Sequence, residues 1–142
     1  FSLDIGAKSI VSIENGSRFE PLIGKPGDGA SPSCAIIDEY HEHETDELVE
    51  TMRTGQGARD EPLLLMISTA GDNIGGPCYQ AMLDAARVVE GNERDDALFA
   101  ALYGLDDGDD WTAEDALKKA NPNYGVSVSA EFLAQERADA LS

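Results

Sequence analysis

Two adjacent carboxylates, Asp38 and Glu39, end a short apolar stretch that begins at Ser33 (SCAIIDE). An apolar run without alternation is typical of a parallel strand that is covered on both faces. In α/β sheets, ligands bind in the crevice outside the carboxyl ends of such strands. The sequence therefore predicts that the chemistry of this chain lies at Asp38 and Glu39.

A second apolar run shares these features and ends in small polar residues. Residues 62–67 (PLLLMI) are apolar without alternation and continue into Ser68, Thr69, Ala70 and Gly71. The carboxyl ends of parallel strands meet at one edge of a sheet, so we expect Ser68 and Thr69 to lie beside the two carboxylates.

Helical patterns alternate with these strands, and each has a recognisable start or stop signal. We predict helices over 46–54 with Thr45 as N-cap and Gly55 as the stop, over 76/77–90 with Gly91 past its end, over 113–120 with Thr112 as cap, and from Ser129 to about 141. Residues 97–105 (ALFAALYGL) are a candidate third strand. Near the N-terminus, short β-prone runs flank Asn15 and Gly16, which favour a hairpin with a type I′ turn. The expected fold class is α/β, a parallel sheet flanked by helices, with an N-terminal β-hairpin and a C-terminal helical segment.

Composition limits the classes of partner. The chain has 142 residues, enough for one ordinary domain, and carries 28 acidic against 10 basic residues for a net charge of -18. Such a surface repels DNA phosphates and anionic lipids unless the basic residues converge, and it also fits adaptation to salt or an organism with acidic proteins. Cys34 and Cys78 are too few for a disulfide framework and are expected to be reduced core thiols of a cytosolic protein. The run Leu63 to Ile67 is too short to span a bilayer.

The loop 24–33 contains Gly24 and Lys25, a pair that also occurs in phosphate-binding P-loops. A P-loop needs a glycine five residues before that glycine and a serine or threonine after the lysine, but Phe19 and Pro26 stand there. We therefore interpret this segment as a plain loop with one lysine.

Four segments in order, CAIIDEYHEH, TMRTGQGAR, PLLLMISTAGDN and DDWTAEDALKKANPNYGVSVS, resemble the ATPase portion of the large terminase subunit of tailed bacteriophages. The resemblance runs from about Gly24 to the end of the chain. It implies part of a P-loop NTPase sheet of the ASCE type. It also implies that the full protein uses ATP to drive viral DNA into a procapsid and cuts the concatemer.

The resemblance assigns roles to the residues at the strand ends. IIDE matches the Walker B pattern, in which Asp38 would hold Mg²⁺ and Glu39 would be the catalytic base for the attacking water. Residues 68–70 (STA) match the coupling motif that senses the γ-phosphate of ATP. The alternatives are a buried strand that ends in solvated acids and hydroxyls that merely cap a turn. Arg53, Arg59, Lys25 and Arg18 are rival candidates for an arginine finger or another phosphate contact, and surface charge is the alternative for each.

Two parts of the family pattern are missing from this sequence, the P-loop and the nuclease domain. The chain is therefore expected to be an internal piece of a longer protein and inactive alone, with residues 1–110 from the ATPase domain and 111–142 as a helical linker or lid segment. Expected cofactors are ATP and Mg²⁺. Expected partners are double-stranded DNA, a portal protein, a small terminase subunit and further copies in a ring, in the cytoplasm of a bacterial host.

Without the P-loop strand, the strand at 63–67 would be left as an open edge. We expect residues 97–105, or a second chain, to fill that place.

Two functions from other classes remain open. His41 and His43 (HEHETD) are similar to the HxHxDH zinc ligands of metallo-β-lactamase-like hydrolases, although Thr45 and Asp46 stand where Asp and His are required. The chain could instead be an interaction module without chemistry of its own. Its candidate contact residues lie on the last helix and are Phe132, Leu133, Ala138 and Leu141.

Overall fold

The structure is a computed structural model that describes residues 2–22 and 29–142. Lys25 and most of the loop predicted around it lie outside the described residues. The chain divides into two compact units, residues 1–82 and 83–142. The first unit holds both predicted site segments and is described first.

The N-terminal part of the first unit is a small antiparallel sheet of three strands, β1 (Leu3–Ile5), β2 (Ile10–Ser12) and β3 (Arg18–Phe19). The predicted hairpin is confirmed as β2 and β3, whereas β1 had no recognisable sequence pattern. The type I′ turn is wrong, because only Gly16 in the turn has a positive φ (71°). The loop is longer than two residues and is closed by the Ser12 N–H donating to the Ser17 carbonyl at 2.8 Å.

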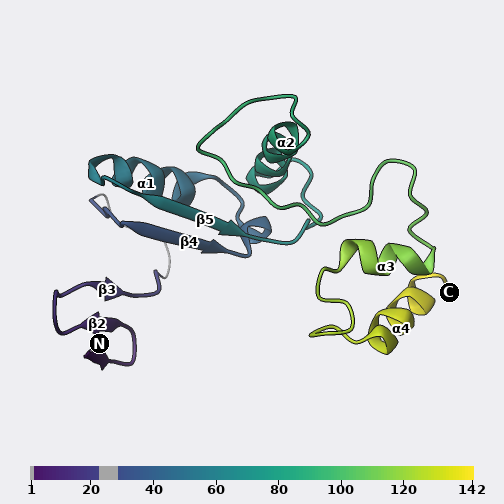
Figure 1. Cartoon of the computed structure of the whole chain (residues 1–142), viewed down its shortest axis with the longest axis horizontal. Helices are drawn as coiled ribbons and strands as arrows, with labels where there is room; N and C mark the ends of the chain where they lie inside the picture. The colour runs from purple at the N-terminus through teal and green to yellow at the C-terminus, as the bar shows by residue number, and fades with distance from the viewer. Residues whose placement is uncertain (1, 23–28) are drawn as a thin grey trace. The chain divides into compact units, whose positions relative to one another are not determined.

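The predicted parallel pair is confirmed as β4 (Cys34–Asp38) and β5 (Leu63–Ile67) (Figure 1). Between them the chain forms a short 3₁₀ turn, η1 (Tyr40–Glu42), then α1 (Glu47–Gly55) and a second turn, η2 (Gln56–Ala58). After β5 comes α2 (Pro77–Val89). The core joins one face of β4 to α1 and to the first turns of α2; its buried members are Ala35, Ile37, Tyr40, Val49 and Met52, with Leu64, Cys78 and Ala81 packed against them.

The strands are not covered on both faces, which corrects the prediction from their apolar sequences. Burial alternates along β4, where Ala35 and Ile37 are buried and Cys34, Ile36 and Asp38 are exposed. Register places the exposed residues of β4 on the same face as Leu63, Leu65 and Ile67, which are also exposed. Cys34 is therefore not a core thiol, whereas Cys78 is half-buried against the core.

The described residues leave β5 as an edge, because the parallel sheet has the order β4–β5. Residues 97–105 form no strand and do not pair with it, so the expectation that they fill this place is wrong. Phe99 and Tyr103 of that segment are exposed. An apolar run becomes a strand only where another strand supplies its backbone hydrogen bonds, and no strand pairs with this segment in the described structure.

In the second unit, the predicted helices are found as α3 (Glu114–Ala120) and α4 (Ala130–Ala140). Ser129 is confirmed as the N-cap of α4, since its side chain accepts from the Phe132 N–H at 3.1 Å. Thr112 does not cap α3; its hydroxyl donates to Asp110 and Ala113 holds the cap position.

In the first unit, Thr45 is likewise not the cap of α1, because the helix begins one residue later and Asp46 holds the cap position. Among the described residues, no helix is long and apolar enough to cross a bilayer.

Candidate functional site

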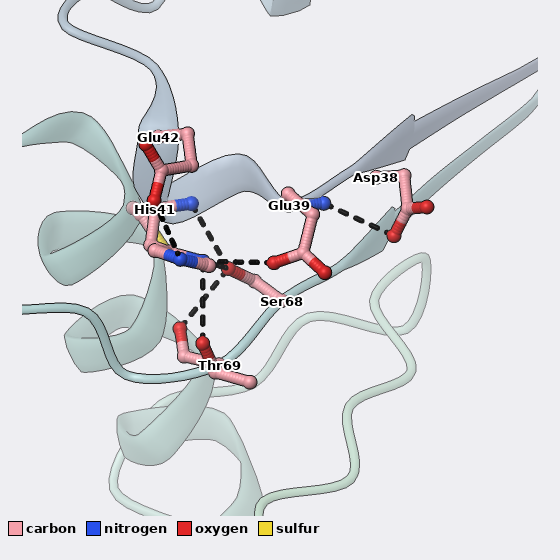
Figure 2. A network of polar contacts seen from close by, with 7 residues as sticks. Asp38, Glu39, His41, Glu42, Ser68 and Thr69 are labelled. Carbon is pink, nitrogen blue, oxygen red and sulfur yellow. Dashed lines mark hydrogen bonds and ion pairs between the residues drawn. The ribbon is translucent and has the colours of Figure 1, made fainter.

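The ends of β4 and β5 lie side by side, as the two sequence runs predicted. Asp38 is paired with Ile67, the last residue of β5, so Glu39 and Ser68 follow at the same end of the sheet. This register brings together the two segments that the sequence singled out, which are far apart along the chain (Figure 2).

Glu39 turns the chain sharply out of the sheet. Its φ of 52° is the one positive φ of a non-glycine residue among the described residues, a conformation that costs about 1–3 kcal/mol. Its N–H donates to the Asp38 Oδ1 at 3.1 Å, which fixes the two acids relative to each other. Strained backbone of this kind is concentrated at functional sites, so it supports the importance of Glu39.

His41 joins the two strand ends, and sequence reasoning considered it only as a zinc ligand. Its backbone N–H donates to the Ser68 Oγ at 2.9 Å. Its ring Nδ1 lies 3.1 Å from the Ser68 Oγ, 3.3 Å from the Thr69 Oγ1 and 3.4 Å from a Glu39 carboxylate oxygen (Figure 2). The position of a histidine two residues after the acids was visible in the sequence, but its partners required the register of the sheet.

Gly71 leaves room for the His41 side chain. Gly71 has a φ of 64°, and a Cβ built there would come within 2.7 Å of the His41 Cβ. The Cys78 thiol, at the start of α2, lies 3.4 Å from the Ser68 Oγ. Ala70 lies between Thr69 and Gly71 in the same exposed segment without regular secondary structure.

Tyr40 anchors the segment to the core. The residue is 4% exposed, and burial raises the pKa of its phenol above the ordinary value of 10.0. The phenol is thus neutral at physiological pH and does not add a charge beside Glu39.

The donor set of this site suits a hard cation rather than zinc. Asp38 and Glu39 offer carboxylate oxygens, which Mg²⁺ prefers, and Ser68 and Thr69 offer hydroxyls. The two histidines do not converge, because the His43 ring packs edge-on against the Tyr40 ring, with 5.4 Å between the ring centroids. Throughout residues 2–22 and 29–142, no group of three or more His, Cys, Asp or Glu side chains could hold a metal ion, so a Mg²⁺ ion at Asp38 and Glu39 would need further ligands from water or phosphate. The zinc hydrolase interpretation therefore has no support in the described structure.

The arginine candidates are not brought to this site by the contacts they make. Arg53 pairs with Glu50 at 2.9 Å, Arg18 pairs with Glu20 at 3.2 Å, and the Arg59 guanidinium donates to the Ser31 carbonyl. Glu39, Ser68 and Thr69 share a contact with His41, and Asp38 accepts from the Glu39 N–H, whereas these cations engage other parts of the first unit.

The fold and the site define a class of protein: an α/β domain with paired acids at the end of one strand and hydroxyls at the end of its parallel neighbour. Residues 5–87 match the family described as terminase large subunit, ATPase domain. This match covers more than half of the 142 residues, and the chain belongs to that family. The resemblance found in the sequence is thereby confirmed.

Two individual proteins and one solved structure are similar to this chain. The chain is 52% identical over 113 residues to protein YmfN of Escherichia coli (strain K12), and 28% identical over 115 residues to the terminase large subunit of enterobacteria phage HK97. Its fold matches the crystal structure of the HK97 bacteriophage large terminase with a TM-score of 0.79 over 97% of this chain, at 24% identity. The matches span 25%, 22% and 29% of the respective relatives, so the chain corresponds to about a quarter of their length.

Proposed function

We propose that this chain provides the two catalytic carboxylates, Asp38 and Glu39, of the ATPase in a viral DNA-packaging motor. The observation that carries the proposal is that Asp38 and Glu39 lie at the same end of the parallel strand pair as Ser68 and Thr69, with His41 in contact with Glu39 and both hydroxyls. All of these residues lie within residues 5–87, which match the family. The fold would be part of a P-loop NTPase sheet, and the phosphate-binding loop would come from elsewhere in the protein. Residues 111–142, which hold α3 and α4, would lead toward a nuclease domain.

In this proposal, Asp38 would hold Mg²⁺ through its exposed carboxylate, directly or through water. The metal would neutralise the charge that develops on the phosphates during hydrolysis. Glu39 orients the attacking water and accepts its proton as the water oxygen bonds to the γ-phosphorus and the bond to the bridging oxygen breaks, which leaves ADP and phosphate. The Ser68 and Thr69 hydroxyls would contact the γ-phosphate and report its loss.

The negative charge of this chain supports DNA binding by other parts of the motor. The net charge of -18 makes the surface of this chain a poor partner for DNA. DNA would therefore be gripped by other parts of the protein or of a ring of subunits on the portal, with the small terminase subunit recognising the viral DNA. Turnover would take place in the cytoplasm of a bacterial host.

The test compares Glu39→Gln with Glu44→Gln in the intact polypeptide, which is the longer protein that includes the phosphate-binding loop. Loss of the base should lower the kcat for ATP hydrolysis by about 100-fold or more, while nucleotide affinity is retained. Glu44 is also exposed and lies five residues further along the chain, so its variant should behave as wild type. Near-normal turnover in Glu39→Gln would remove this residue, and the proposed mechanism, from consideration.

Asp38→Asn provides the second half of the test. It should lower the affinity for Mg²⁺-ATP as well as kcat, because a neutral amide holds a divalent cation weakly. An unchanged Mg²⁺ dependence would assign the metal to other residues.

A further inference from the structure

One nitrogen of the His41 ring contacts both the proposed base, Glu39, and the proposed phosphate-sensing hydroxyls of Ser68 and Thr69. The Nδ1 of His41 lies 3.1 Å from Ser68 Oγ, 3.3 Å from Thr69 Oγ1 and 3.4 Å from Glu39 Oε2. This atom carries at most one proton, and it offers a single lone pair when it carries none. The three oxygens therefore compete for one hydrogen-bonding position.

The histidine itself is fixed more firmly than the carboxylate it contacts. The His41 side chain is 17% exposed, and its ring Nε2 lies 3.2 Å from a Glu42 carboxylate oxygen. The backbone N–H of His41 donates to the Ser68 Oγ. The Glu39 side chain is 63% exposed, and His41 is its one partner in the described part of the chain. The position of the carboxylate thus depends on what His41 is bonded to.

We propose that His41 is a positioning residue that couples the Glu39 carboxylate to the Ser68 and Thr69 hydroxyls. With a proton on Nδ1, the ring N–H donates to Glu39 when the two hydroxyls turn toward a phosphate, and it holds the base in its productive orientation. When the phosphate leaves, the hydroxyl oxygens turn back and accept from the same N–H, and the hold on Glu39 weakens. The inference rests on the proposed function and names a residue that the function did not need.

A merely structural role for His41 predicts something different. The ring and the backbone N–H could simply tie the end of β4 to the end of β5, in which case any loss would appear in stability and nucleotide affinity. A positioning role requires a loss in kcat without a matching change in KM. It also requires that a side chain with a polar group at the Nδ1 position restores activity.

The experiment uses the intact polypeptide with His41→Ala, His41→Asn and His41→Gln. We expect His41→Ala to lower kcat by about tenfold, part of what a general base contributes, with KM for ATP within about twofold of wild type. Asparagine places its amide near the Nδ1 position and should recover most of kcat. Glutamine reaches toward Nε2 and should not.

His43→Ala is the matched control, since His43 follows two residues later and packs against Tyr40 without contacting either hydroxyl. It should leave kcat unchanged. Wild-type kcat in His41→Ala, or equal activity in the asparagine and glutamine variants, would overturn the inference. If His41→Ala does not fold, the comparison of asparagine with glutamine decides alone.

Hydrogen exchange gives a readout that needs no turnover. Addition of the slowly hydrolysed analogue ATPγS to wild type should change the exchange of the backbone amides both in 68–71 and in 39–42. In His41→Ala the change at 68–71 should remain and the change at 39–42 should be lost. A change at both segments in the variant would show that the coupling does not pass through His41.

The two proposals fail in distinguishable ways. If Glu39→Gln keeps normal turnover, the proposed function falls and the inference falls with it. If Glu39→Gln is inactive while His41→Ala turns over normally, only the role of His41 is wrong.

Discussion

Substitution of Gly71 by alanine tests whether the geometry around His41 matters. Gly71 has a φ of 64°, and alanine in that left-handed region costs about 1–2 kcal/mol. The new Cβ would also lie 2.7 Å from the His41 Cβ, whereas carbon atoms prefer about 3.5–4.0 Å. The ring must therefore move by about 1 Å, which weakens its contacts with Ser68 and Thr69 by about 0.5–1.5 kcal/mol each.

Gly16→Ala is the control that isolates the backbone term. Gly16 has a similar φ of 71°, and a Cβ there would meet nothing within 4 Å. We expect Gly16→Ala to lower the free energy of unfolding by about 1–2 kcal/mol and Gly71→Ala by about 2–5 kcal/mol, measured by chemical denaturation. In the intact polypeptide, only Gly71→Ala should also lower the kcat for ATP hydrolysis. Equal effects of the two variants on both quantities would refute the reasoning about His41.

Three further predictions concern the frame around the site. Met52 is 1% exposed, so Met52→Ala should cost about 2–5 kcal/mol of unfolding free energy in denaturant titration, against a clearly smaller loss for Met66→Ala at 36% exposure. A Cβ on Gly55 would lie 1.9 Å from the Ala30 carbonyl oxygen, so Gly55→Ala should lower the free energy of unfolding by about 1–3 kcal/mol. A Cβ on Gly57 would meet open space, so Gly57→Ala should leave the free energy of unfolding unchanged. Equal values for the two variants would contradict the packing described. The hydrogen bond from Lys119 lowers the pKa of Asp109 below its ordinary 3.8, so this contact stabilises the fold above pH 3.8 and is lost as pH falls through the lower, folded-state pKa. Carboxyl NMR titration of Lys119→Met should show the Asp109 pKa rising toward its ordinary value, and an unchanged pKa would remove Lys119 as the cause.

The elements with strong local signals were predictable from sequence. β4 ends at Asp38 as its apolar run does, and α4 begins after Ser129 because the cap is a contact between residues three apart. The parallel pairing of the strands follows from the alternation of strand and helix patterns, which predicts that Glu39 and Ser68 follow the two strands at the same end of the sheet.

What depends on partners distant in sequence could not be predicted. An apolar run indicates burial but not how many faces are buried, so the exposure of Ile36 and Leu65 was not foreseen. Residues 97–105 have the composition of a strand, but pairing requires another segment at the right register. The contacts of His41 could not be predicted because its partners Ser68 and Thr69 are 27 and 28 residues away.

The most direct test of the central claim is a crystal structure of the intact polypeptide with ATPγS and Mn²⁺ in place of Mg²⁺. Manganese is located by its anomalous scattering. We expect a manganese peak within about 5 Å of the Asp38 carboxylate, a distance that allows one bridging water, with the γ-phosphate near Thr69. A metal and nucleotide bound away from the ends of β4 and β5 would contradict the proposed function.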